Sequence, residues 1–283
     1  MDRAYFRRRD TFQSFWHGGS LSPLAWLSLS SFAKQGHRVE LYCYEKMHLP
    51  EGVDRKSADE IISKDGVFYI HDSYSTFANL FRFQLLIMKG GWWTDTDVLC
   101  TGKDIPDNEI VFSEEEHGAI NNALIKFPKN HPVSREMVSE IRKLKLEDIR
   151  FGQTGADLLT RVVKLHQLDR LSRPREHFYP LHWLETYKFI IPEFSDEVAN
   201  KIESSPFVHF WNNIFRRFGF VVSTNRPPAD SFLDVQYKKY QIYDRYNLRK
   251  IDENELRMRV NTYLKQDWAA EHASSHGLTI PYV

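Results

Sequence analysis

The first 45 residues have the pattern of strand, helix and strand, and this order restricts the fold more than any other feature of the sequence. TFQSFW (11–16) and RVELYCYE (38–45) have the composition and alternation of strands. Between them, Ser22-Pro23 predicts the start of a helix that ends before Gly36. Two strands joined by a helix are typical of a right-handed crossover in a parallel sheet. The sequence therefore predicts an α/β fold.

The later segments continue this mixture of helices and strands. Helices are expected at about 74–88, in PVSREMVSEIRKLK and in GADLLTRVVKLH, and strands at 109–116, 121–128 and 206–211. Residues 231–283 are polar and rich in tyrosine, with one helix expected near 253–268. No repeat or linker divides the chain. We expect one domain, residues 1–230, with a helical C-terminal extension, residues 231–283, packed on it.

Composition excludes several classes of protein. The 283 residues are 42% hydrophobic, which is ample for a core, and 38 basic residues balance 38 acidic ones. A net charge of zero gives no overall attraction to nucleic acid or to acidic membranes. Any site for an anion must therefore be built locally.

Cysteine use and hydropathy point to a cytoplasmic protein. Cys43 and Cys100 lie in apolar, strand-like runs, which favours buried free thiols in a reducing compartment over a disulfide. No apolar segment follows the basic residues of MDRAYFRRRD, and no apolar run reaches 18 residues. We expect no membrane span and no signal peptide, and peripheral membrane contact stays open.

The stretch GGWWTDTD (90–97) carries the most informative polar residues. Asp95 and Asp97 are separated by one residue at the end of an apolar strand. Because alternate residues of a strand point to the same side, both carboxylates would point to one side. Their repulsion would be relieved by Mg²⁺ or Mn²⁺, which prefer oxygen ligands and often bind phosphate as well. The alternative is a solvated acidic turn without a ligand.

The helix before this stretch adds two polar residues. Asn79 and Arg82 are three positions apart and share a helix face. The planar guanidinium of Arg82 suits phosphate recognition, although a surface salt bridge would also explain it. Gly90-Gly91 would end the helix and let the chain turn directly into the acidic strand.

These residues resemble glycosyltransferases with a DXD sugar-binding region, namely family 32 enzymes of the α-1,4-galactosyltransferase type and, more distantly, the glucosylating clostridial toxins. Their pattern S-D-x-x-R, a helix and G-G-x-Y-x-D-x-D corresponds to ANLFR (78–82) and GGWWTDTD (90–97). Further segments resemble the family in order, over about residues 12–230: FWHGG (15–19), NNALIKFPKNHP (121–132), FGQTGADLL (151–159) and PFVHFWNNIFRR (206–217).

The resemblance implies a GT-A fold, in which a Rossmann-like nucleotide-sugar-binding half (1–115) and an acceptor half (116–230) share one mixed sheet. It implies retaining transfer of a sugar from a nucleotide-sugar donor, with UDP-sugars leading by frequency in the family, to a glycan or other hydroxyl acceptor. Mn²⁺ or Mg²⁺ would assist, and polysaccharide biosynthesis is the corresponding process. No nucleic acid partner is implied.

The resemblance also implies roles for single residues. Asp95, Asp97 and Arg82 would be catalytic: Asp97 ligates the metal, Asp95 contacts the ribose or donor sugar and bridges toward the metal, and Arg82 contacts the donor sugar or diphosphate. His209 would be a further metal ligand, with a core histidine as the alternative.

Other residues would line the nucleotide. Trp16 would stack on the base, with core packing as the equal alternative, and Gly18 lies in the adjoining glycine turn. Trp93 replaces the usual Tyr as an aromatic wall, and Trp211 would lie against the diphosphate.

Two departures from the family pattern bear on specificity. Asn79 stands where many relatives have Asp, which would alter the preference for the donor sugar. Ala156 replaces a Pro and would affect loop stiffness only. Glu114, Glu115 and Glu116 end a strand on the expected acceptor side and could position a hydroxyl, although a solvated turn explains them more simply.

Two other functions stay open at this point. The same metal site with water as acceptor would give a nucleotide-sugar hydrolase. A degenerate transferase scaffold would give a non-catalytic module that binds a glycan or a protein.

Overall fold

A computed structural model of the chain describes residues 10–70, 73–102, 104–145, 148–149, 152–220, 224–266 and 269. Its centre is a six-stranded sheet in the order β3-β2-β1-β4-β7-β6. The strands are β1 (Thr11–Trp16), β2 (Arg38–Cys43), β3 (Val53–Ser57), β4 (Gly91–Thr94), β6 (Val111–Glu116) and β7 (Ala119–Phe127). The first four in this spatial order are parallel, and β7 is antiparallel to both β4 and β6. The expected α/β class with a Rossmann-like parallel half and a mixed sheet is confirmed.

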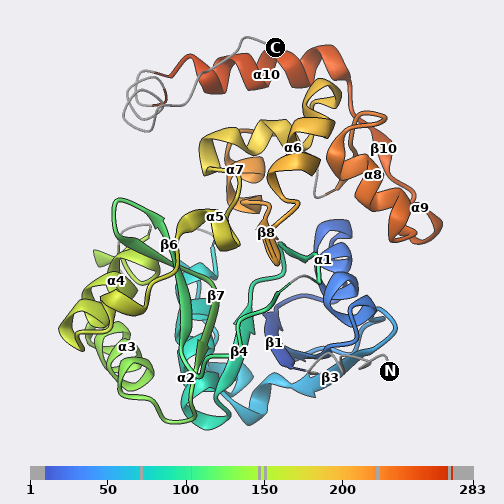
Figure 1. The fold of residues 1–283 in the computed structure, drawn as a ribbon. Coiled ribbons are helices and arrows are strands. Elements are labelled where there is room, and N and C mark those ends of the chain that lie inside the picture. The colour runs from blue at the N-terminus through green and yellow to red at the C-terminus, as the bar shows by residue number, and fades with distance from the viewer. Residues whose placement is uncertain are drawn as a thin grey trace, which may run out of the picture.

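Helices surround this sheet and form a second, mainly helical part beyond one of its edges (Figure 1). The α-helices are α1 (Pro23–Lys34), α2 (Ser75–Met88), α3 (Pro132–Lys143), α4 (Ala156–Leu165), α5 (Arg175–Phe178), α6 (Ser195–Lys201), α7 (Asn212–Arg217), α8 (Phe232–Lys239), α9 (Ile242–Arg245) and α10 (Glu253–Leu264). Short 3₁₀ helices lie at Ala58–Glu60, Lys64–Gly66, Asp169–Leu171, Pro192–Phe194 and, as the longest, η5 (Trp183–Phe189). Two small sheets pair β5 (Val98–Cys100) with β8 (Phe207–His209) and β9 (Asn225–Arg226) with β10 (Arg249–Lys250).

The sheet separates two hydrophobic cores, because neighbouring residues of a strand point to opposite faces. Trp92 packs with α1 and the C-terminal helices, whereas Trp93 packs with α2, α3 and α4. The same alternation places Leu41 and Tyr42 of β2 in different cores. The adjacent tryptophans are therefore both structural, and each holds a different layer of helices against the sheet.

Local signals explain why the first elements begin and end where they do. The Ser22 side chain accepts a hydrogen bond from the Ala25 N–H, which caps α1 as the sequence predicts. The expected strand 11–16 is β1, and its parallel pairing with β2 confirms the crossover. After α2, Gly90 has φ = 69°, and a Cβ there would lie 2.3 Å from the Lys129 backbone nitrogen. Only glycine fits this turn into β4.

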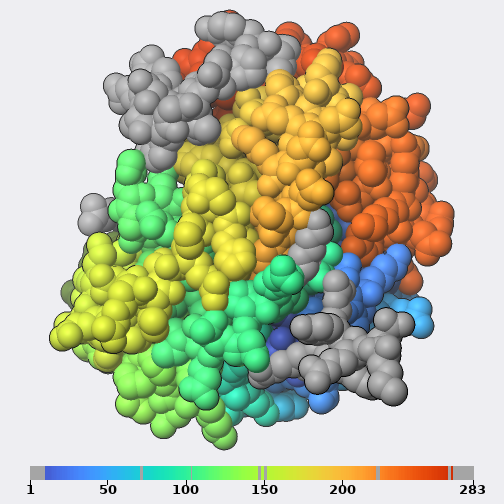
Figure 2. Space-filling model, viewed as in Figure 1, coloured from blue at the N-terminus to red at the C-terminus, as the bar shows by residue number. Residues whose placement is uncertain are grey.

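The described C-terminal residues join the core of the molecule. The helix expected near 253–268 is α10, and the structure adds α8 and α9 before it; residues 267–268 and 270–283 lie outside the described residues. Phe232, Tyr237 and Ile242 belong to the same hydrophobic cluster as α1. The Tyr246 hydroxyl donates to the Leu21 carbonyl at 3.0 Å. Figure 2 shows this orange segment directly against the blue N-terminal helix.

Two expectations about the chain as a whole can be compared with the structure. Cys43 and Cys100 are both buried free thiols, as predicted. Within the described residues, no helix combines the length and apolar character that a membrane crossing requires.

Candidate active site

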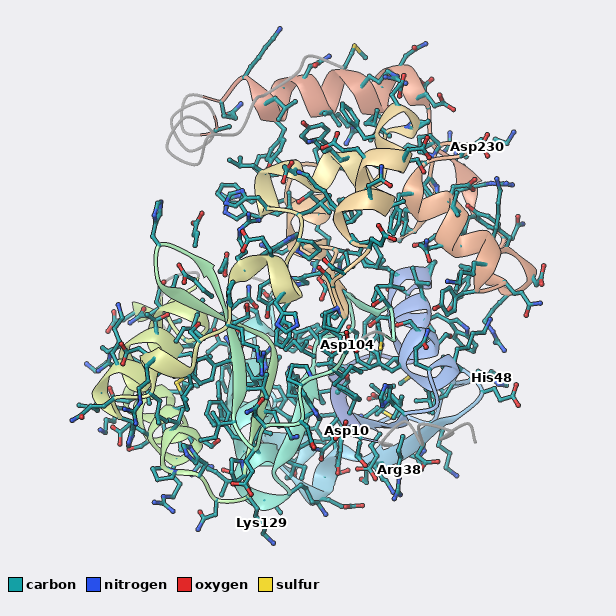
Figure 3. All side chains as sticks on the ribbon, viewed as in Figure 1. Asp10, Arg38, His48, Asp104, Lys129 and Asp230 are labelled. Carbon is teal, nitrogen blue, oxygen red and sulfur yellow. The ribbon has the colours of Figure 1, made fainter. Side chains whose placement is uncertain are left out.

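The paired aspartates lie in the turn that joins β4 to β5. β4 ends at Thr94 and β5 begins at Val98, so Asp95 and Asp97 are not part of an extended strand. The strand alternation that was expected to point both carboxylates to one side therefore does not apply, and the two side chains have different partners. The turn lies at the carboxyl edge of the parallel strands, where α/β sheets commonly bind ligands. The opposite edge of the sheet is marked in Figure 3 by Arg38, at the start of β2, and by Lys129, just beyond the end of β7.

Asp95 is held by α2 and β7. Its Oδ1 accepts hydrogen bonds from Arg82 Nη2 at 2.6 Å and from the Trp93 indole N–H at 2.7 Å. Arg82 Nη1 donates to the Asn122 carbonyl at 2.6 Å, and the Asp95 N–H donates to the Ala123 carbonyl at 2.7 Å. Arg82 is only 3% exposed, so its main role in this structure is to fix Asp95 rather than to project toward solvent.

Asp97 is held by the segment that follows β8. Its Oδ2 lies 3.3 Å from His209 Nε2 and accepts a hydrogen bond from the Asn212 N–H at 2.9 Å. The Asp97 carbonyl accepts from the Phe210 N–H at 2.9 Å. Trp211 takes a left-handed conformation, with φ = 55°, which turns the chain so that the start of α7 meets the carboxylate. Residues more than 110 positions apart thus form one site.

The charges at the site influence one another. Burial raises the pKa of Asp95, against the effect of Arg82, and the charge of Asp97 raises it further. Burial alone would raise the pKa of Asp97, but His209 and the Asn212 N–H hold it below the ordinary value. Burial acts to lower the pKa of His209, yet the carboxylates of Asp97 and Asp95 raise it. Asp97 and His209, 3.3 Å apart, thus each favour the charged form of the other.

Asn79 belongs to a polar group beside Arg82. Its Nδ2 donates to Thr154 Oγ1 at 3.1 Å, and its Oδ1 accepts from Asn122 Nδ2 at 3.0 Å. Because the Asn122 carbonyl also binds Arg82, Asn79 and Arg82 do share a helix face, as the spacing predicts. Both ends of the Asn79 amide are engaged, and they connect α2 to β7 and to the QTG segment before α4.

The residues expected at the base lie at the end of β1. β1 and β4 are parallel neighbours with Gln13 opposite Trp93, so Trp16 and the aspartate turn share one edge of the sheet. The Trp16 indole N–H donates to the Ser20 carbonyl at 3.0 Å, and its ring is partly buried against the core. Gly18, with φ = 129°, lies close beside that indole. In the described part of the chain, neither residue makes a hydrogen bond to the aspartates.

Two further tryptophans are less open than their expected roles require. Trp93 is 2% exposed and Trp211 is 8% exposed. The indole N–H of Trp93 is used by Asp95, and that of Trp211 donates to the Leu181 carbonyl at 3.2 Å. In this structure Trp93 orients a carboxylate, and the ring of Trp211 packs against that of His209 in a tilted arrangement, with centroids 4.2 Å apart.

The donor atoms can be compared with what a divalent cation needs. His209 Nδ1 and Asn212 Oδ1 are buried without a hydrogen-bond partner among the described residues. Buried polar atoms are rarely left unpaired without a reason. Over the same described residues, however, no three His, Cys, Asp or Glu side chains stand together as a ready metal cluster. The residue types at this turn, two carboxylates and a buried imidazole, nevertheless suit a divalent cation.

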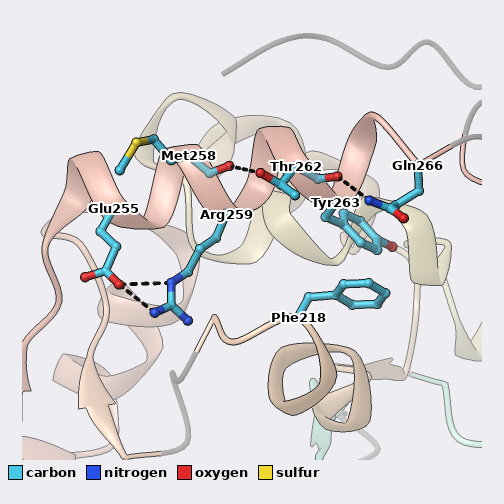
Figure 4. A pocket seen from close by; sticks show the side chains of 7 residues that line it. All are labelled: Phe218, Glu255, Met258, Arg259, Thr262, Tyr263 and Gln266. Atoms are coloured by element: carbon cyan, nitrogen blue, oxygen red, sulfur yellow. Dashed lines mark hydrogen bonds and ion pairs between the residues drawn. The ribbon is translucent and has the colours of Figure 1, made fainter.

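A pocket away from the aspartates has a structural origin. It measures about 310 Å³ and lies between Phe218 and the outer turns of α10 (Figure 4). Arg259 on its wall is held by Glu255 and by the Gly219 carbonyl. The rings of Phe218 and Tyr263 pack at 4.5 Å. These contacts attach α10 to the molecule, and we assign no chemistry to this pocket.

Several residues at the site were not predicted from the sequence. Asn122, Thr154 and Asn212 hold Asn79, Arg82 or Asp97, and all three lie inside segments that resemble the family. The doubled Asn of NNALIKF and of FWNN was the available signal, since amides next to apolar strands need partners. Phe151 of the FGQTGADLL segment lies outside the described residues.

Comparison with known proteins supports the resemblance seen in the sequence. Residues 126–232 match the family described as the alpha 1,4-glycosyltransferase conserved region. The match includes His209 and Trp211, and the paired aspartates precede it. The resemblance to α-1,4-galactosyltransferase-type enzymes is thereby confirmed for this part of the chain.

The chain is also similar in sequence to an individual galactosyltransferase. The chain is 28% identical over 149 residues to the lactosylceramide 4-alpha-galactosyltransferase of Rattus norvegicus, which covers 46% of this chain and 39% of that protein. The chain thus matches well under half of that relative's length.

Two solved structures resemble the chain at low identity. The PaToxG glycosyltransferase shares 10% identity at a TM-score of 0.44, with coverage of 85% of this chain and 87% of that one. The galactosyltransferase LgtC, in complex with donor and acceptor sugar analogues, shares 12% identity at a TM-score of 0.40, with coverage of 88% and 99%.

Proposed function

We propose that the protein is a retaining, metal-dependent glycosyltransferase with a GT-A fold, and that it moves a sugar from a nucleotide-sugar donor, with UDP-sugars first, to a glycan hydroxyl. One observation carries the proposal: Arg82, Asp95, Asp97 and His209 converge at the carboxyl edge of a parallel sheet. The match of residues 126–232 to a glycosyltransferase region supports it.

Mn²⁺ or Mg²⁺ would be held by Asp97, Asp95 and His209, because carboxylate oxygens and imidazole are suitable ligands. When bound, the cation would neutralise charge on the departing diphosphate. Among the described residues, His209 Nδ1 has no hydrogen-bond partner, which supports this assignment because Asp97 engages only Nε2 of the buried ring.

The chain's own residues would orient the reacting groups. Arg82 and Trp93 fix the direction of the Asp95 carboxylate, and the Asn212 N–H fixes that of Asp97. The acceptor oxygen would bond to the anomeric carbon on the face from which the diphosphate departs. The bond between that carbon and the diphosphate oxygen breaks, and the hydroxyl proton leaves with the diphosphate.

The test is calorimetric titration of UDP into the full chain with MnCl₂ and again with EDTA, followed by a panel of nucleotide sugars. We expect binding that requires Mn²⁺ and is abolished in Asp97→Asn. The matched control is Asp54→Asn, on the exposed strand β3, where the aspartate side chain is 55% exposed and pairs with Arg38. Equal Mn²⁺-dependent binding by wild type and Asp97→Asn would refute the metal site.

The same panel separates the alternative functions. Transfer to added glycosides that exceeds donor hydrolysis identifies a transferase. Hydrolysis without any transfer identifies a nucleotide-sugar hydrolase. Glycan binding without turnover of any donor identifies a binding module, and each of these last two results would replace the proposed function.

A further inference from the structure

The three consecutive glutamates at the end of β6 have different surroundings. Glu114 Oε1 accepts a hydrogen bond from the Gly118 N–H at 2.6 Å, which closes the turn between β6 and β7. Glu116 Oε2 lies 2.8 Å from His182 Nε2 and 3.4 Å from the Trp183 indole nitrogen. Both carboxylates therefore have evident structural roles, one in the hairpin turn and one in anchoring η5.

Glu115 is oriented by β7, the strand that also holds the aspartate turn. Its Oε2 accepts from Asn121 Nδ2 at 2.8 Å, and Asn121 Oδ1 accepts from the Ala123 N–H at 2.7 Å. The Ala123 carbonyl in turn accepts from the Asp95 N–H. Asn121 is 5% exposed, so its amide cannot turn freely. A continuous series of hydrogen bonds thus fixes Glu115 relative to Asp95.

The free oxygen of Glu115 is the notable feature. Among the described residues, Glu115 Oε1 has no hydrogen-bond partner, and the side chain is only partly buried, so a ligand can reach it. The charge of Glu115 acts to raise the pKa of His209 and of Tyr179. His209 is 7% exposed, and its Nδ1 lacks a partner in the same described part. Hydrogen bonds through Asn121 and Ala123 thus tie Glu115 to the aspartate turn, and His209 contacts the same turn through Asp97.

We propose that Glu115 binds the acceptor, with Oε1 accepting a hydrogen bond from the sugar hydroxyl that attacks the donor. The proposal rests on the function proposed above. A carboxylate with one oxygen fixed by Asn121 presents the other in a defined direction, as hydroxyl recognition requires. Glu115 is tied through Asn121 and Ala123 to Asp95, whereas the carboxylates of Glu114 and Glu116 bind the hairpin turn and η5.

The test uses Glu115→Gln in the full chain, with Mn²⁺, UDP-galactose as donor and lactose or simple methyl glycosides as acceptors. The glutamine oxygen can still accept from Asn121, while its amide group replaces the free carboxylate oxygen with a donor. We expect transfer to fall about 10- to 100-fold, mainly through the KM of the acceptor. In Glu115→Gln, the affinity for UDP and the rate of donor hydrolysis should stay within about twofold of wild type. In the control Glu114→Gln, these two quantities and the transfer rate should all stay within that range.

The outcomes separate this proposal from the proposed function. Absence of Mn²⁺-dependent UDP binding in the wild type would overturn the proposed function itself. With that binding present, unchanged transfer in Glu115→Gln, or an equal fall in UDP affinity and hydrolysis, would overturn the acceptor role. A wild type that hydrolyses the donor and transfers to none of the acceptors would overturn it as well. A second variant, Glu115→Asp, keeps the charge but withdraws the oxygen, and it should raise the acceptor KM without changing UDP affinity.

Discussion

Arg82 Nη2 lies 2.6 Å from Asp95 Oδ1, and the same guanidinium donates to the Asn122 carbonyl through Nη1. One buried side chain thereby joins α2, β7 and the turn that carries the paired aspartates. The planar fork of arginine can serve two acceptors in fixed directions, which a single ammonium cannot do with the same geometry.

Arg82→Lys should therefore destabilise the protein. Because one of the two acceptors of this buried guanidinium loses its partner, we expect a fall of about 1–3 kcal/mol in the free energy of unfolding, measured by urea denaturation. The matched control is Arg161→Lys, since Arg161 is mostly exposed in its ion pair with Glu140. That control should change stability by no more than about 0.5 kcal/mol. Equal effects of the two substitutions would contradict the bridging role of Arg82.

Trp16→Ala should weaken nucleotide binding if Trp16 stacks on the base. Stacking of a base on an aromatic ring contributes about 1–3 kcal/mol, so UDP affinity should fall by that amount in calorimetry. Affinity for inorganic diphosphate should stay unchanged. Trp26→Ala is the control, because Trp26 is also partly buried but packs under Arg245, with the guanidinium 3.9 Å from the ring. If both ligands lose affinity equally in Trp16→Ala, Trp16 only packs in the core.

Gly90→Ala tests the turn that leads into the site. The new methyl group would overlap the Lys129 backbone, and the residue would also keep a positive φ. Gly36→Ala shares the positive φ but meets no atom within 4 Å. The control should cost about 1–2 kcal/mol from backbone strain. Gly90→Ala should cost at least about 2 kcal/mol more, since backbone cannot move aside as a side chain can. Similar melting temperatures for the two variants would show that the turn adjusts.

Asp234 gives a prediction for pH. This carboxylate is fully buried and accepts hydrogen bonds from Lys238 at 2.7 Å (also an ion pair), from the Tyr243 hydroxyl and from the Asp230 N–H. Burial acts to raise its pKa, but these partners hold the pKa below its ordinary value. Its stabilisation is therefore fully present above the unfolded-state pKa of about 3.9 and is lost as pH falls through the folded-state value.

The expected result is a stability difference between wild type and Asp234→Asn that is largest near pH 7, at about 1–3 kcal/mol, and that shrinks below pH 4. Urea denaturation at pH 7, 5 and 3 measures it. Asp244→Asn, at an exposed position of α9, should show no such trend. A difference that stays constant over this range would mean that the charge of Asp234 does not contribute.

The sequence predicts the elements whose signals are local. Ser22, Pro23 and Gly36 delimit α1, and alternation delimits β1 and β2, so caps and periodicity sufficed there. The roles of Asp95 and Asp97 could not be separated in this way. Their partners come from α2 and from the end of β8, and no local rule indicates that β4 stops one residue before the first aspartate.

Asn79 also shows that local sequence rules do not identify partners from distant parts of the chain. Its spacing from Arg82 correctly predicts a shared helix face, yet its partner Thr154 is 75 residues away in the chain. Because both ends of its amide are hydrogen-bonded, Asn79 has a structural role in this protein. Its direct role in recognising the donor sugar remains a prediction. The C-terminal helices were missed in part because their buried aromatic residues are interspersed with charged ones.

The contact between Tyr246 and Leu21 has a consequence for how the chain is made. The two residues are 225 positions apart, and α8 and α9 cover apolar side chains of α1. At 5–20 residues per second, synthesis takes about 10–45 s to span this separation. During that interval the apolar face of α1 has emerged and its C-terminal cover has not. Part of the apolar surface of α1 therefore stays exposed on the nascent chain until its last helices are complete.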